Sequence, residues 1–231
     1  MENIALIGID LGKHSFHVPC QDKSGKALLC KKCTRTKLMQ FLATCPSAVV
    51  VMEACAGAHF MARRISDIGH EAKLISPQFV RPFVKSNKNN FVDAEAICEA
   101  ASRPSMRFVQ PRTEGQQAMR ALHRVRESLI RDKAKTTNQM HGFLLEFGIS
   151  LPIGEPVIKR LSLALADHEI PEYLSRLLMK LHAHYLYLVE QITELESELN
   201  RSIKVDDTAQ RIMTIPGVGP DYGQSSLIPT R

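Results

Sequence analysis

The stretch IALIGIDLGKHSF, residues 4–16, places one carboxylate, Asp10, directly after an apolar run and follows it with a glycine and a hydroxyl. Burying an uncompensated charge costs free energy, so an acid at the end of a buried strand needs a chemical reason. Two interpretations fit this stretch. Asp10 ligates a divalent metal ion, or it lies close to a bound nucleotide phosphate.

Outward from this stretch, short β-branched and apolar runs alternate with short amphipathic helices up to about residue 112. The pattern predicts strands at residues 3–10, 15–22, 26–33, 47–54 and 71–76, and helices near 35–43 and 57–68. A turn at residues 23–25 indicates a hairpin, so the first three strands run antiparallel before a crossover helix brings the fourth beside the first. This order predicts an α/β domain with the mixed sheet of the RNase H-like fold.

Beyond this domain, from about residue 113 to 203, the strand pattern disappears. A four-three apolar spacing keeps one seam facing a partner helix for about 40 Å, and it runs through Leu174, Leu178, Leu181, Tyr185, Leu188, Ile192, Leu195 and Leu199. A less regular seam precedes it at Ala118, Leu122, Val125, Leu129, Met140, Phe143 and Phe147. The two seams predict a coiled coil formed within the chain, between two chains, or both; a helical bundle with no partner is the alternative.

The charge distribution suits a polyanionic partner. The formal net charge is +6 and the sequence pI is about 9.1. The first long helix carries a surplus of cations, and Arg120, Arg124 and Arg131 are the candidate contacts to a nucleic-acid backbone. The alternative is that these arginines pair with the acidic stretch at residues 190–200.

Two further features exclude protein classes. The six cysteines contain one C-x-x-C pair, Cys30 and Cys33, and no second pair that would complete a structural zinc site, so we expect reduced thiols. No apolar run reaches the length of a membrane span, and the N-terminus lacks the pattern of a signal peptide. The expected location is the cytoplasm.

The acids carry the main functional signal. Glu53 ends the apolar run AVVVM as Asp10 ends the first strand, and a helix over NNFVDAEAICEA sets Asn90 and Asp93 on one face. Oxygen ligands from two strands and a helix suit Mg²⁺ or Mn²⁺, and two such ions can clamp both oxygens of a phosphodiester exchange. Each acid taken singly could cap a helix or face solvent, but the ordered set predicts a metal site.

Three segments carry a family resemblance: IGIDLGKHSFHV at residues 7–18, the run from VVVMEACAG to AEAICEA at 49–100, and MTIPGVGP at 213–220. With the coiled coil between them, the sequence resembles the DEDD transposases of the insertion-sequence 110 type, in their 1111-like branch. The resemblance implies a RuvC-like domain whose Asp, Glu, Asp and Asp bind Mg²⁺, a helical segment, and a second domain with a serine nucleophile. It also implies DNA transposition and recombination, an element-encoded guide RNA, a homo-oligomer joined through the coiled coil, and a location at the bacterial nucleoid.

Matched to the family pattern, Asp10 is the first acid, Glu53 the second and Asp93 the fourth, and these three are the expected catalytic and metal-binding residues. Asn90 stands at the third acid position. Its carbonyl can still ligate Mg²⁺, but the loss of a negative charge weakens the site. Lys88 in the same segment is a possible phosphate contact, or a solvated loop lysine.

The C-terminal motif IPGVGP resembles the start of a helix-hairpin-helix, in which Gly217 and Gly219 offer backbone N–H groups to a phosphate. The next residues, DYGQSSLIPTR, do not continue as an apolar helix. The expected organisation is a DEDD domain at 1–111, a coiled-coil segment at 112–204 and the start of the second catalytic domain at 205–231. We therefore expect a truncated copy of a transposase that binds nucleic acid without completing transposition.

Two rival functions are weighed against this expectation. An actin-like ATPase needs glycine-rich phosphate and adenosine loops downstream, and the sequence has no Gly-Gly pair. A stand-alone RuvC-like junction nuclease would keep the metal site, but the order of the motifs and the C-terminal glycine motif favour the transposase.

Overall fold

The computed structural model describes residues 3–12, 15–84, 90–152, 154–205, 210–211 and 214; the side chains of residues 90–92 are outside this description. The described residues up to Gln116 form one compact unit, and those from Gln117 onward form a second. The domain boundaries at 111 and 204 stay predictions.

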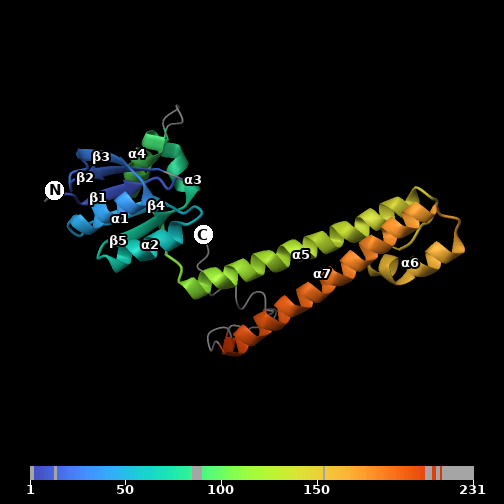
Figure 1. Ribbon diagram of the computed structural model, residues 1–231. Helices are drawn as coiled ribbons and strands as arrows, with labels where there is room; N and C mark the ends of the chain where they lie inside the picture. Colours follow the sequence, from blue (N-terminus) through green and yellow to red (C-terminus); the bar gives the residue numbers. More distant parts are fainter. Residues whose placement is uncertain are drawn as a thin grey trace. The chain divides into compact units, whose positions relative to one another are not determined.

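The first unit is built on a six-stranded mixed sheet, labelled in Figure 1. Its strands are β1 (Leu6–Ile9), β2 (Phe16–Gln21), β3 (Ala27–Cys33), β4 (Val49–Glu53), β5 (Glu71–Ile75) and β6 (Phe108–Val109). Their spatial order is β3-β2-β1-β4-β5-β6, with β1, β4 and β5 parallel and the other pairings antiparallel. The predicted RNase H-like arrangement is confirmed, and β6 is an addition that the sequence pattern did not predict.

Helices cover both faces of the sheet. They are α1 (Arg35–Thr44), α2 (Ala58–Asp67), α3 (Pro77–Val80), the 3₁₀ helix η1 (Arg81–Phe83) and α4 (Asn90–Ala101). Alternate residues of β1 and β4, such as Ile7 and Val50, pack with α1 and α2 in one core. The residues between them, such as Val51, pack with α4 in a second core. The period-two alternation therefore decides which helix each strand residue meets.

The second unit contains the long helices α5 (Glu114–Leu145) and α7 (Glu172–Val205), which run side by side (Figure 1), and the shorter α6 (Glu155–Asp167). The predicted seam of α7 is confirmed, since it buries Leu178, Tyr185, Leu188, Ile192 and Leu199. Across the pair, Arg126 of α5 donates two hydrogen bonds to Oε1 of Glu196 on α7, at 3.1 and 2.7 Å. The coiled coil is thus formed within the chain. None of the described helices combines the length and the apolarity needed to cross a membrane.

The predicted seam of α5 is wrong in part. Val125 and Phe143 are exposed, at 51% and 38%, whereas Thr136 and Thr137 are buried. The threonine hydroxyls donate to backbone carbonyls of their own helix, Thr136 to Asp132 at 2.8 Å, so they can be buried without an unsatisfied polar group. A search for apolar residues alone cannot find such positions.

Candidate active site

The pairing of β1 with β4 sets two acids side by side. Gly8 pairs with Val51 and Ile9 with Met52, so Asp10 and Glu53 are the next residues of the two parallel strands. Because side chains alternate along a strand, both acids lie on the face that carries Gly8 and Val51. This is the face that α4 covers.

Helix α4 contributes the third acid. Asp93 lies in its first turn, and Ile97 and Ala100, which follow on the same stripe of the helix, are buried against the sheet. The helix approaches β1 closely, since a Cβ atom at Gly8 would lie 2.5 Å from Cys98 Sγ and 2.9 Å from the Ala94 carbonyl oxygen. Gly8 therefore allows α4 to bring Asp93 to the carboxyl ends of β1 and β4.

The three carboxylates act on one another electrostatically. Partial burial raises the pKa of Asp10, and the negative charge of Asp93 raises it further, while His17 lowers it. Burial also raises the pKa of Glu53, with contributions in the same direction from Asp10 and Asp93, while Arg81 opposes the shift. The charge of Asp93 thus acts on both Asp10 and Glu53, so the three carboxylates lie near one another.

The donor set fits a hard divalent cation in its chemistry, because it consists of carboxylate oxygens on one face of the sheet. In their present spacing, however, no group of three or more His, Cys, Asp or Glu side chains among the described residues is close enough to share an ion. A divalent cation bound among the carboxylates would offset their mutual repulsion. The roles of Asp10, Glu53 and Asp93 as catalytic and metal-binding residues stay a prediction.

The other predicted contacts lie on α4, on α5 or outside the described residues. Asn90 is the first residue of α4, three residues before Asp93. Lys88, Gly217 and Gly219 lie outside the described residues. The predicted arginines of α5 divide between exposed positions, Arg124 and Arg131, and the half-buried Arg120. Arg131 pairs with Glu127 at 3.8 Å on its own helix.

Several residues near the acids were not singled out from the sequence. His17 lowers the pKa of Asp10, and Arg81 lowers that of Glu53. The thiol of Cys55 lies near the same acids, and its pKa is raised by burial first and then by the charges of Glu53 and Asp10. The sequence places His17 in the second predicted strand, but only the strand register shows that it pairs with Asp10.

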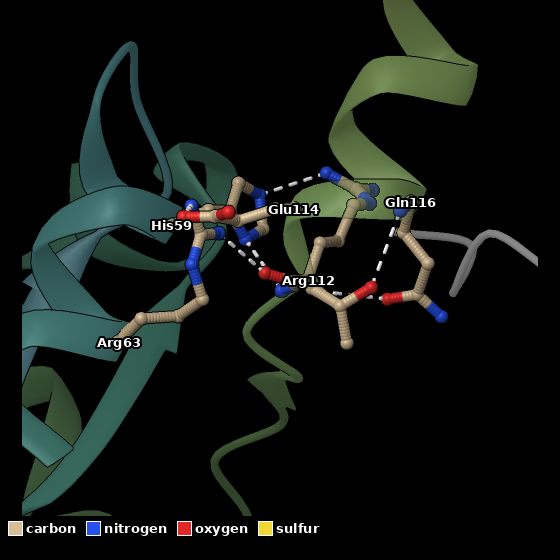
Figure 2. Close-up of polar contacts among 6 residues, drawn as sticks. His59, Arg63, Arg112, Glu114 and Gln116 are labelled. Carbon is tan, nitrogen blue, oxygen red and sulfur yellow. Dashed lines mark hydrogen bonds and ion pairs between the residues drawn. The ribbon is translucent and has the colours of Figure 1, made fainter. Parts of the chain in front are cut away.

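A polar network ties α2, which follows Glu53, to the start of α5 (Figure 2). The buried Arg112 donates its backbone N–H to His59 Nδ1 at 3.1 Å, and its guanidinium lies 2.7 Å from His59 Nε2. Arg63 donates to the Arg112 carbonyl at 2.6 Å and pairs with Glu114 at 3.6 Å. Arg112 is thus a structural residue of the first unit.

Comparisons with known proteins identify the family of the chain. The family model of the DEDD transposases of the insertion-sequence 110 type, described as "Transposase", matches residues 7–149. The chain is 67% identical over 219 residues to the "Transposase for insertion sequence element IS1328" of Yersinia enterocolitica, covering 95% of this chain and 66% of that protein.

Two more distant relatives extend the comparison. A "Putative transposase y4pF/y4sB" of Sinorhizobium fredii is 40% identical, over 99% of this chain and 59% of its own length. The "Transposase for insertion sequence element IS1111A" of Coxiella burnetii is 37% identical, over 95% of this chain and 61% of its own length. The chain therefore spans about three fifths to two thirds of the length of the curated relatives it matches.

Proposed function

Because the chain belongs to the DEDD transposase family of insertion sequences, we propose that it binds DNA and takes part in Mg²⁺-dependent DNA transposition and recombination. Family membership implies dependence on a divalent metal ion, and Mg²⁺ is the ion that carboxylate sites of phosphoryl-transfer enzymes commonly use. The observation that supports the proposal most directly is the in-register position of Asp10 and Glu53 on the face covered by α4, inside the matched region.

In this proposal the three acids hold the metal, and their neighbours adjust their charge. Asp10, Glu53 and Asp93 would supply carboxylate oxygens, with Asn90 as a neutral fourth ligand. When bound, the metal would stabilise the charge on the attacking and leaving oxygens of a phosphodiester. His17 favours the ionised form of Asp10 and Arg81 favours that of Glu53, so both prepare the acids to bind a cation.

The proposed partners follow from the same assignment. Arg120, Arg124 and Arg131 on α5 would contact the nucleic-acid backbone, together with Lys88 and the backbone of Gly217 and Gly219. A structured RNA encoded by the element is the proposed guide, and a homo-oligomer would form through the coiled-coil helices. A protein with these partners would work at the bacterial nucleoid.

Metal binding is the sharpest test of the site. Mn²⁺ is titrated into the protein, and electron paramagnetic resonance measures the free ion. Asp10→Asn and Glu53→Gln should each lower the Mn²⁺ affinity by at least about tenfold, because losing even a residue that only supports a metal ligand costs about that much. Asp67→Asn, at an exposed position on α2, is the matched control and should bind as the unchanged chain does. Equal affinity in all four proteins would refute the assignment.

DNA activity separates the proposal from its rival. Binding of duplex DNA without nicking of branched DNA in Mg²⁺ would agree with a transposase chain. Efficient nicking of four-way junctions by this chain alone, abolished by Asp10→Asn, would instead support a junction nuclease.

A further inference from the structure

A row of paired residues crosses the sheet at the level of the acids. Lys32 on β3 pairs with His17 on β2, and His17 forms an isolated bridge with Asp10. The next residue along this row, on β4, is Glu53. Directly paired residues of neighbouring strands point to the same face of a sheet. Lys32 and His17 therefore lie on the face of the acids.

The preceding residue, Lys31, points the other way. Its Nζ lies 4.2 Å from the centroid of the Phe41 ring on α1, on the opposite face. Cys30 gives a further check, because it pairs with Pro19, whose ring lies beside Gly8 on the α4 face, so Cys30 and Lys32 share that face. Burial raises the pKa of the Cys30 thiol, and the charge of Glu95 on α4 raises it further. Two adjacent lysines of β3 thus serve opposite faces.

Lys32 is well placed to bind an anion. It is exposed, and among the residues that the structure describes no acid forms an ion pair with it. Two strand spacings separate it from Asp10, which is about 10 Å. Along one strand of B-form DNA the axial rise is about 3.4 Å per nucleotide, and the strand also winds around the axis, so this distance covers about one or two nucleotides.

A cation beside the acid cluster would help it to hold a DNA strand. Three carboxylates repel a phosphate backbone, and a metal ion offsets that repulsion only at the phosphate it touches. Residues 23–37, which include β3, contain six lysines and arginines and no acid. Of the two lysines on β3, Lys31 lies on the opposite face, so Lys32 is the one that can supply positive charge beside the acids.

We propose that His17 and Lys32 form a phosphate-binding track that runs from the acid cluster to the β3 edge and holds a DNA strand about one or two nucleotides from the phosphate at the acids. The track rests on the proposed function, since it needs DNA at the acid site. Lys32 acts as an exposed point charge for a phosphate, and His17 lies between it and Asp10.

The adjacent lysines provide a matched pair of variants for the test. The full chain is titrated onto a fluorescein-labelled DNA duplex in Ca²⁺, and anisotropy gives the Kd at several salt concentrations. We expect Lys32→Gln to weaken binding about fivefold or more and to reduce the slope of log K against log salt by about 0.9, the value for one phosphate contact. Lys31→Gln removes the same charge from the opposite face and should change neither quantity, while Lys32→Arg should retain binding.

The outcomes separate the two proposals. If the unchanged chain does not bind DNA, the proposed function and the track both fail. If it binds, and Lys32→Gln and Lys31→Gln behave alike, the track is refuted while the proposed function stands. A labelled RNA hairpin is titrated in parallel. If Lys32→Gln weakens the binding of RNA but not of DNA, DNA is refuted as the nucleic acid bound by the track. Circular dichroism and the protection of the Cys98 thiol check that each variant is folded.

Discussion

Replacing Gly8 with alanine tests how the fold brings α4 to the acids. The added methyl group would lie 2.5 Å from Cys98 Sγ and 2.9 Å from the Ala94 carbonyl oxygen, whereas carbon atoms pack favourably at about 3.5–4.0 Å. The Cys98 side chain is fully buried and Ala94 contributes backbone, so neither can yield without moving α4. Overpacking of this kind costs about 1–3 kcal/mol.

The chain offers a separate probe for each unit. All six cysteines lie between residues 20 and 98, and all four tyrosines lie at or after Tyr173. Cys20 and Cys98 are buried, and burial raises the pKa of both thiols to about 12, so a thiol reagent reaches them only when the first unit opens. Labelling of these thiols reports on the sheet, while tyrosine fluorescence reports on the helical unit.

We expect Gly8→Ala to speed the labelling of Cys98 by at least about fivefold, because a loss of 1 kcal/mol raises the open population by that factor. Tyrosine fluorescence should be unchanged. Mn²⁺ affinity should fall as well, since a displaced α4 carries Asp93 away from Asp10. In the Gly8→Ala background, Cys98→Ala removes the Sγ contact, so the labelling of Cys20 should return part of the way to normal.

A matched control is Gly115→Ala, at a helical glycine whose added Cβ would come no closer than 4.0 Å to the Thr113 hydroxyl. It should leave labelling unchanged or slow it, because alanine favours a helix. Labelling of Cys98 in Gly8→Ala at the rate of the unchanged chain would refute the argument that this glycine sets the position of α4.

Three further predictions concern the charges. Without metal, Asp10→Asn should raise the free energy of unfolding at neutral pH. The folded-state pKa of Asp10 is raised, so the unchanged chain gains stability as the pH falls toward 3.8. The free energies of unfolding of the two proteins, measured by urea titration, should therefore converge in acid. Joint reversal of Arg120, Arg124 and Arg131 to glutamate should flatten the salt dependence of DNA binding, and an equal slope would assign these arginines to the coiled coil. Asn90→Asp should tighten Mn²⁺ binding by restoring a charged ligand, and electron paramagnetic resonance measures the change; equal affinity in the two proteins would argue against Asn90 as a ligand.

The sequence alone determined the order of the first four strands and the ends of the strands at which the acids lie. Residues 4–10 and 48–53 each form an apolar run that ends in an acid, and the hairpin turn near residue 24 fixes the antiparallel start of the sheet. These signals are local, since they depend on the period of side chains along one segment and on turn residues. The four-three apolar spacing predicted the seam of α7 correctly, because the buried positions of that helix are apolar.

Only the tertiary structure decided which residues of different segments meet. The row from Lys32 through His17 to Asp10 depends on strand register, and a slip of one residue would turn each side chain to the other face. The close approach of α4 to Gly8 and the threonines buried in the seam of α5 depend on contacts between segments far apart in the chain. No local pattern carries such information, because the burial of a residue is decided by the segment that packs against it.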